Sequence, residues 1–336
     1  MQLSKQFNTS RPTVIKALDK LLNLALIYKV QGKGSFVNID HISTTSQECK
    51  IISLVMPFAD QRDKGRLDEL NIIKGVEKQL GIHGYNLMIH YCKNTATDFF
   101  AAMRRVKESV SSGIIVYVAQ NLNDFEQICD IFLDNHPIVL LDKSLVGFNL
   151  PCVKVNNIKG ASLATKHMIG CNYDVICFLS DLDISLNESV RERYLGFRQV
   201  QTSMQNNYVF EHLQFNDVDG SLSDSAILSS LKELIDKYPG KRIGLVCVSD
   251  FFAQRVYSAV STLNLSVPSE IGITGFDGVN TLLPNQHKLT SISNDFYAIG
   301  NNAASLIFEM VTQKTLVNKS VILDVDLCIG DTTSKR

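Results

Sequence analysis

Polar side chains at the ends of short apolar runs are the residues of this sequence best suited to hold a ligand. The acceptors at these positions are Asp142, Ser249, Asp250 and Asp277, and Arg193 begins a segment with helical spacing. Carboxylates and hydroxyls accept hydrogen bonds, whereas a guanidinium donates them in a fixed plane. Because the hydroxyls of a polyhydroxylated ligand need both kinds of partner, the set favours such a ligand. The alternative is that the aspartates only cap the helices that follow them.

The spacings that mark common catalytic and metal sites are missing from the sequence. It has no G-x-S-x-G, G-x-x-x-x-G-K-[ST] or H-E-x-x-H motif, and its seven histidines show no ligand-type spacing. The eight cysteines form no C-x-x-C pair and lie mostly in apolar runs, which indicates reduced thiols in a core. We therefore expect no catalysis, no cofactor and no metal.

The charge of the chain is unevenly distributed. Residues 1–38 carry six basic side chains and one acidic side chain, a net charge of +5 in a chain whose overall charge is −1. A short basic module on an acidic body is typical of nucleic-acid binding, because phosphate contacts need clustered cations. The alternative is an ordinary solvated face.

The first 38 residues have the pattern of a winged helix-turn-helix. Leu3–Phe7 has the character of a helix end, Ser10 caps a second helix that contains Pro12 in its first turn, and two β-rich runs follow. The glycines on either side of Lys33 suit a hairpin tip. The residues predicted to contact DNA are Ser10, Arg11, Thr13, Lys16, Lys33 and Gly34. The alternative is a winged helix that makes only protein contacts.

The segment LSKQFNTSRPTVIKALDKLLNLALIYKVQGKGSFV resembles the second half of a GntR-type DNA-binding domain. The S-R-x-T-V and G-K-G-S-F-V elements carry the resemblance. Ile15 stands where that family usually has an arginine that contacts DNA, and the family's first helix has no counterpart after Met1. We expect this first helix either to lie upstream of Met1 or to have been lost by truncation.

Beyond a polar linker, apolar runs alternate with amphipathic stretches. The expected strands are Ile51–Pro57, Asn86–His90, Gly113–Val118, Pro137–Asp142, Val153–Asn156, Val175–Leu179, Arg242–Val248 and Ile271–Phe276. The expected helices include Ile72–Leu80, Phe99–Val110, Gly160–Ile169, Tyr194–Met204 and Ala226–Leu234. This alternation predicts an α/β fold with parallel sheets covered by helices. The strands are too many for one sheet unit, so we expect two subdomains with a ligand at the carboxyl ends of their strands.

The motifs ESVRERYLGF, LVCVSDFFA, IGITGFD and LTSISNDFYAIG, in this order, resemble a LacI-type effector domain, which is similar to periplasmic sugar-binding proteins. The resemblance covers residues 50–333. It implies that Arg193 and Asp277 bind an effector, with Asn294 in the place of the family's Gln and Ser249 in the place of its Asn. Asp142 matches an effector-facing position in the N-terminal subdomain. Phe58 is our candidate for stacking on a sugar, with a plain core or rim position as the alternative.

The two resemblances predict a winged helix-turn-helix over 1–38, a linker over 39–49 and an effector-binding and dimerisation domain over 50–333, the arrangement of AraR-type arabinose repressors. We therefore expect a cytoplasmic, homodimeric bacterial transcriptional repressor of carbohydrate-utilisation genes. Its partners would be a two-fold symmetric operator and a small-molecule effector, with no membrane association. The alternative is a periplasmic-type sugar-binding protein without DNA-binding activity. That reading needs an export signal, and the N-terminus has no apolar h-region.

Overall fold

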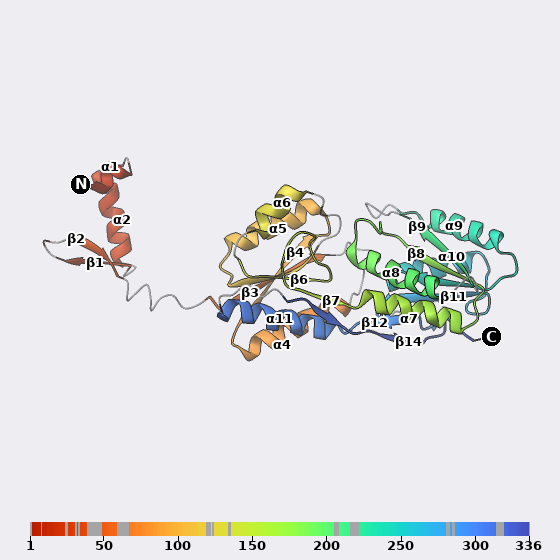
Figure 1. The fold of residues 1–336 in the computed structure, drawn as a ribbon. Helices are drawn as coiled ribbons and strands as arrows, with labels where there is room; N and C mark the ends of the chain where they lie inside the picture. Colours follow the sequence, from red (N-terminus) through yellow and green to blue (C-terminus); the bar gives the residue numbers. More distant parts are fainter. Residues whose placement is uncertain are drawn as a thin grey trace. The chain divides into compact units, whose positions relative to one another are not determined.

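A computed structural model places the chain in two compact units, Met1–Lys50 and Ile51–Arg336. The structure describes all residues except 1, 8, 24–25, 31, 33, 39–48, 59–66, 119–121, 123, 134–135, 205–207, 216–221, 280–282, 284–285, 314–318 and 336. Figure 1 shows the elements of both units along the chain.

The described residues of the first unit form two helices and a hairpin. Helix α1 spans Gln2–Gln6, α2 spans Arg11–Asn23, and β1 (Ile27–Val30) pairs antiparallel with β2 (Gly34–Val37). Ser10 starts α2, since its hydroxyl accepts the Thr13 backbone N–H at 3.3 Å. Gly34 has a φ of +118°, a conformation that a side chain would strain, so the hairpin needs glycine there. No described residue of α2 is buried within this unit.

The second unit contains a first subdomain built on one parallel sheet. Its strands lie in the order β13-β7-β6-β5-β3-β4, and each neighbouring pair is parallel. The strands are β3 (Ile51–Phe58), β4 (Asn86–Lys93), β5 (Gly113–Tyr117), β6 (Ile138–Leu141), β7 (Cys152–Val155) and β13 (Val321–Leu323). The helices are α4 (Leu67–Ile82), α5 (Ala96–Glu108), α6 (Phe125–Phe132) and α11 (Phe296–Gln313).

Helices α4 and α11 pack in backbone contact on this sheet. A Cβ on Gly75 would lie 2.2 Å from the Tyr297 carbonyl oxygen, and one on Gly300 would lie 2.1 Å from the Ile72 carbonyl oxygen. Glycine on both helices therefore permits an approach that any side chain would prevent.

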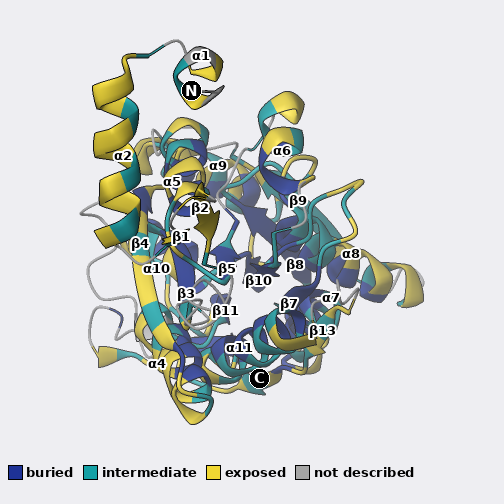
Figure 2. Ribbon diagram, turned by 90° about the vertical axis from the view of Figure 1, so that its left-hand side faces the viewer, coloured by how far each residue is buried: buried dark blue, intermediate teal, exposed yellow. Residues whose placement is uncertain are grey.

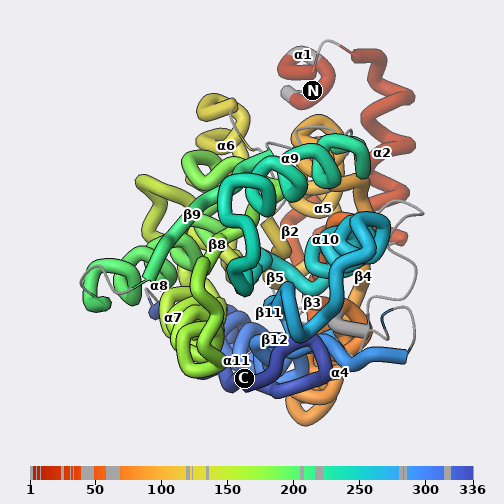
Figure 3. The backbone as a smooth tube through the Cα atoms, turned by 90° about the vertical axis from the view of Figure 1, so that its right-hand side faces the viewer, coloured from red at the N-terminus to blue at the C-terminus, as the bar shows by residue number. Residues whose placement is uncertain are grey.

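A second sheet forms the other subdomain. Its order is β14-β12-β11-β10-β8-β9, and all neighbours are parallel except β12 and β14. The strands are β8 (Val175–Ser180), β9 (Val209–Gln214), β10 (Ile243–Cys247), β11 (Ile271–Asp277), β12 (Thr290–Ser293) and β14 (Asp326–Cys328). The helices are α7 (Asn157–Gly170), α8 (Glu188–Ser203), α9 (Asp224–Lys237) and α10 (Asp250–Thr262). Figure 3 shows α7 with α8 on one face of this sheet and α9 with α10 on the other.

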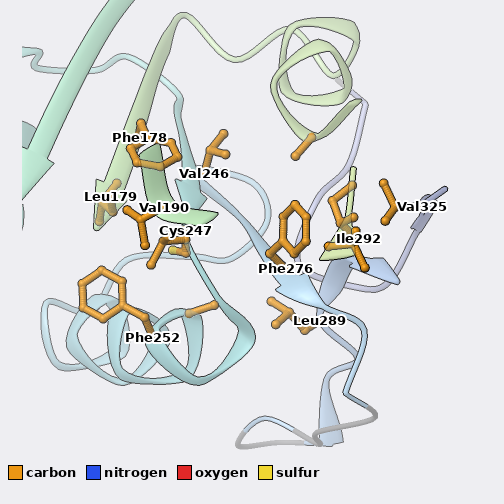
Figure 4. Packing of buried hydrophobic residues seen from close by; sticks show 14 of the residues in the cluster. Phe178, Leu179, Val190, Val246, Cys247, Phe252, Phe276, Leu289, Ile292 and Val325 are labelled. Carbon is orange, nitrogen blue, oxygen red and sulfur yellow. The ribbon is translucent and has the colours of Figure 1, made fainter. Parts of the chain in front are cut away.

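The buried core lies where helices cover both faces of a sheet. Every residue of β8 and β10 is buried, because helices cover both faces of the sheet. Figure 2 shows the central strands in the buried colour and the outer helix faces exposed. Figure 4 shows Phe178, Phe252, Phe276 and Ile292 packed around the strands of the second sheet.

The chain passes between the two subdomains after β7, after β12 and after β13. The predicted α/β fold with two parallel-sheet subdomains is confirmed. The predicted strand Val153–Asn156 was placed one residue too late, since the Asn156 side chain caps α7 by accepting the Lys159 backbone N–H at 3.0 Å. Strands β9, β12, β13 and β14 were missed, because they are short or lie at or near a sheet edge with half-exposed, mixed side chains.

Candidate functional site

Arg193 on α8 is a buried cation held from several directions. Its Nε donates to Asn157 Oδ1 at 2.9 Å and its Nη1 to the Val248 carbonyl at 2.5 Å. Its Nη2 lies 3.5 Å from Asp277 Oδ1, and the guanidinium covers the Phe276 ring at 3.7 Å. A buried charge is tolerated only with such partners. The outer N–H groups that remain are donors in a fixed direction.

Asp277 and Asn294 supply acceptors beside this guanidinium. Asp277 ends β11 with a φ of +121°, and Asn294 Nδ2 donates to Asp277 Oδ1 at 3.3 Å. Asn294 Oδ1 is buried, and no donor among the described residues reaches it. A buried acceptor without a partner costs free energy, and a donor that reached it would recover that cost. The structure therefore brings together three of the predicted site residues, Arg193, Asp277 and Asn294.

Ser249 and Asp250, which follow β10, have different roles: Ser249 caps a helix and Asp250 is a buried acceptor. Ser249 caps α10 by accepting the Phe252 backbone N–H at 3.2 Å. Asp250 is buried and accepts from Ser291 Oγ at 2.5 Å and from the Val279 backbone N–H at 2.8 Å. Burial, aided by the Asp277 charge, raises the pKa of Asp250 well above its ordinary value. The alternative that Asp250 only caps the following helix is therefore wrong. Its carboxyl instead accepts a hydrogen bond from the backbone of the loop after β11.

Asp142 follows β6 in the other subdomain, with a φ of +73° and a half-buried side chain. Lys143 beside it is buried, and burial lowers the pKa of its ammonium. Among the hydrogen bonds of the described residues, none joins Asp142 to Arg193, Asp277 or Asn294. Phe58 ends β3, and its side chain lies outside the described residues.

Sequence reasoning missed a polar cluster that connects the two subdomains. Lys154 of β7 pairs with Glu188 at 2.9 Å and with Glu192 at 2.6 Å, both on α8. Ser144 donates its backbone N–H and its hydroxyl to Glu188, at 2.5 Å and 2.7 Å. Burial raises the pKa of Glu188, but the bonds from Ser144 and Lys154 outweigh burial and leave that pKa below its ordinary value. The signal available was the i, i+4 spacing of the two glutamates on one helix.

The predicted DNA-contacting residues lie in the first unit. Ser10, Arg11, Thr13 and Lys16 are exposed at the start of α2. The hydroxyls of Ser10 and Thr13 are 2.7 Å apart, so the two side chains also bond to each other. Gly34 begins β2, and Lys33 lies outside the described residues.

In the described ranges no group of three or more His, Cys, Asp or Glu side chains is arranged to hold a metal ion. None of the helices that the structure describes is long and apolar enough to cross a membrane.

The fold and these strand-end residues define a class of protein. The family model of the periplasmic binding protein-like domain matches residues 165–333, half of the chain, and the chain belongs to this family. The relatives of the chain are transcriptional regulators. It is 23% identical over 325 residues to an arabinose metabolism transcriptional repressor of Geobacillus stearothermophilus, which covers 94% of this chain and 85% of the relative. It is 25% identical to the transcriptional regulator RegA of Clostridium saccharobutylicum, over 90% of this chain and 88% of the relative.

Solved structures share the fold. A transcriptional regulator CelR in complex with cellobiose has a TM-score of 0.70 at 16% identity and covers 84% of each chain. A Lac repressor dimer bound to operator has a TM-score of 0.68 at 16% identity, over 89% of this chain and 99% of the other. A LacI family regulator from Enterococcus faecium with bound ribose has a TM-score of 0.65 at 18% identity, over 85% of this chain and 99% of the other.

Proposed function

We propose that this chain is a sugar-responsive transcriptional repressor of carbohydrate-utilisation genes. In this proposal residues 1–38 are a GntR-type winged helix-turn-helix that binds operator DNA, 39–49 are a linker, and 50–333 bind the effector and dimerise. The protein works in the cytoplasm, as its relatives' names as transcriptional repressors suggest. It carries out no catalysis.

The observation that carries the proposal is the arrangement of Arg193, Asp277 and Asn294. A sugar hydroxyl both donates and accepts, so it can take an N–H from Arg193 and give its own hydrogen to a neighbouring acceptor. Asp277 and the unpartnered Asn294 oxygen are such acceptors. Ser249, Asp142 and Phe58 are proposed to complete the site from the adjoining strand ends of both subdomains.

The DNA-binding half of the proposal is supported by the first unit. Its second helix begins with exposed Ser10, Arg11 and Thr13, the end that enters a major groove in helix-turn-helix proteins. Lys16 and the hairpin tip at Lys33 and Gly34 would contact phosphates. Two copies in a homodimer would place two such helices on a two-fold symmetric operator.

A thermal-shift screen tests the effector. The probes are a panel of pentoses, hexoses and disaccharides that includes L-arabinose, D-ribose and cellobiose, with buffer alone as the control. A ligand present at a hundred times its dissociation constant stabilises the folded state by about 2.7 kcal/mol. The proposal predicts such a shift with one sugar; a flat result with a broad panel of pentoses, hexoses and disaccharides contradicts it.

Operator binding is tested separately. Selection from random duplexes should yield a palindromic site, and fluorescence anisotropy with that site measures affinity with and without the sugar. Because coupling between two sites is reciprocal, operator DNA must also change the affinity for the sugar by the same factor. Sugar binding without any selected DNA would favour a sugar-binding protein that is not a repressor.

A further inference from the structure

A line of hydrogen bonds runs from the first subdomain to the Arg193 guanidinium. Lys154 Nζ on β7 lies 2.6 Å from Glu192 Oε1 on α8. Asn157 Nδ2, on the first residue of α7, donates to Glu192 Oε2 at 3.0 Å. Arg193 Nε then donates to Asn157 Oδ1 at 2.9 Å. We call Lys154, Glu192 and Asn157 the Arg193 relay.

The relay is shielded from water at its Arg193 end. Asn157 is 1% exposed and Arg193 is 7% exposed. The side chains of Lys154 and Glu192 are 12% and 20% exposed. Buried polar groups that lose a partner are costly, so each member constrains the orientation of the next.

The chemistry of the relay fixes the direction of the Asn157 amide. An amide can present either its oxygen or its NH₂ group to a neighbour, whereas an ionised carboxylate only accepts and a guanidinium only donates. Glu192 therefore draws the NH₂ group toward itself, which leaves the oxygen facing Arg193 Nε. Without Glu192 the Asn157 NH₂ group would lose its acceptor, and the amide would be held only through its bond to Arg193.

Lys154 holds the start of the relay from the other subdomain. Its ammonium also pairs with Glu188 at 2.9 Å, and Glu188 accepts from Ser144 in the loop after β6. Burial lowers the pKa of Lys154, but its bonds to Glu192 and Glu188 outweigh burial and raise that pKa above its ordinary value. The ammonium therefore stays charged and keeps both glutamates in place.

We propose that Lys154, Glu192 and Asn157 are positioning residues that orient Arg193 for the effector, so that one subdomain sets the donor geometry in the other. The proposal rests on the proposed function for its ligand but not for its geometry. The competing explanation is an ion pair that contributes only to folding.

The first test needs no ligand. In the full-length protein with ¹⁵N-labelled arginine, the Nε–H exchange rate of Arg193 is measured by NMR, and Arg193→Lys assigns the peak. Glu192→Leu should speed exchange by roughly tenfold or more, the factor expected for loss of a hydrogen-bonded charged group. Glu192→Asp keeps a carboxylate, which can only accept, and should change the exchange rate less than Glu192→Leu. Lys154→Met gives a second test if the Leu variant does not fold.

The matched control is Lys237→Met, which removes another Lys–Glu pair of 2.6 Å, with Glu211, away from Arg193. It should leave the Arg193 peak unchanged. Unchanged exchange in both Glu192→Leu and Lys154→Met overturns the proposal.

The second test titrates L-arabinose, D-ribose and cellobiose. For any of these that binds the wild type, Glu192→Leu should weaken affinity by about tenfold, and Glu192→Asp should weaken it less. Equal affinity in Glu192→Leu overturns the positioning role and leaves the proposed function standing. If no sugar of the thermal-shift panel binds the wild type, the proposed function loses its support and the exchange measurement still decides the relay.

Discussion

The guanidinium carbon of Arg193 lies over the Phe276 ring, 3.7 Å from its centroid, and Arg193 Nη2 lies 3.5 Å from Oδ1 of the next residue, Asp277. Both contacts come from the end of β11. An aromatic ring attracts a cation most strongly where water is excluded, and Phe276 is buried. Each guanidinium nitrogen of Arg193 makes one hydrogen bond to a described residue, which leaves one N–H on Nη1 and one on Nη2 for a ligand.

Replacing this ring should weaken both stability and effector binding. Phe276→Leu keeps an apolar side chain but removes the cation–π contact and leaves a small void, so we expect a loss of about 1–3 kcal/mol in urea unfolding. Phe252→Leu is the control, because that ring is also fully buried but has no arginine on its face. Both variants should be destabilised, but only Phe276→Leu should weaken sugar binding; equal binding by the two would argue against a role for the ring.

A methyl group on Gly275 should displace the Asp250 carboxyl, which binds the loop after β11. Its Cβ would lie 2.0 Å from Asp250 Oδ1, so either the carboxyl or strand β11 must move. We expect Gly275→Ala to cost about 1–3 kcal/mol, as overpacked cores do. Gly81→Ala in α4 has open space around it and should be neutral or slightly stabilising. Similar unfolding midpoints for the two variants would contradict the tight contact.

Asp250 should make stability fall as the pH rises. Its pKa is raised in the folded protein, so the folded state holds a proton that the unfolded state releases above an ordinary value of 3.8. The free energy of unfolding therefore declines from that pH up to the raised pKa. Asp250→Asn should remove this slope and gain stability relative to wild type toward neutral pH. Urea unfolding across the pH range measures it, with the exposed Asp236→Asn as control; parallel curves for wild type and Asp250→Asn would refute the assignment.

Glu188 should make the free energy of unfolding fall as the pH falls, opposite to Asp250. Its pKa is lowered in the folded protein, so its stabilising contribution is complete above the ordinary value of 4.5 and is lost as the pH falls through the lower folded pKa. Glu188→Gln should therefore be less stable than wild type at neutral pH and approach it in acid. The difference in unfolding free energy between the two proteins, followed from neutral to acid pH, checks the sign, and a difference that grows in acid would be the wrong result.

The parallel sheets could be predicted because their central strands are buried on both faces and are therefore continuous apolar runs, as in β8 and β10. The meeting of Arg193 with Asp277 followed from strand-end positions and from the family motif. The Arg193 relay could not be predicted, since Lys154 meets Glu192 only where the chain crosses between subdomains. The roles of Ser249 and Asp250 depend on which of the two is the cap of α10. The spacing of apolar residues does not locate a helix start to within one residue.

The central claim is that Arg193 and Asp277 bind a sugar effector. Isothermal titration calorimetry of the wild type with L-arabinose, D-ribose and cellobiose, repeated with Arg193→Gln and Asp277→Asn, tests it most directly, with Lys237→Met as the control for folding. We predict that one sugar binds the wild type and the control alike, and that each site variant binds it about tenfold to a hundredfold more weakly, as expected for loss of a charged hydrogen bond. Wild-type affinity in both site variants would contradict the account.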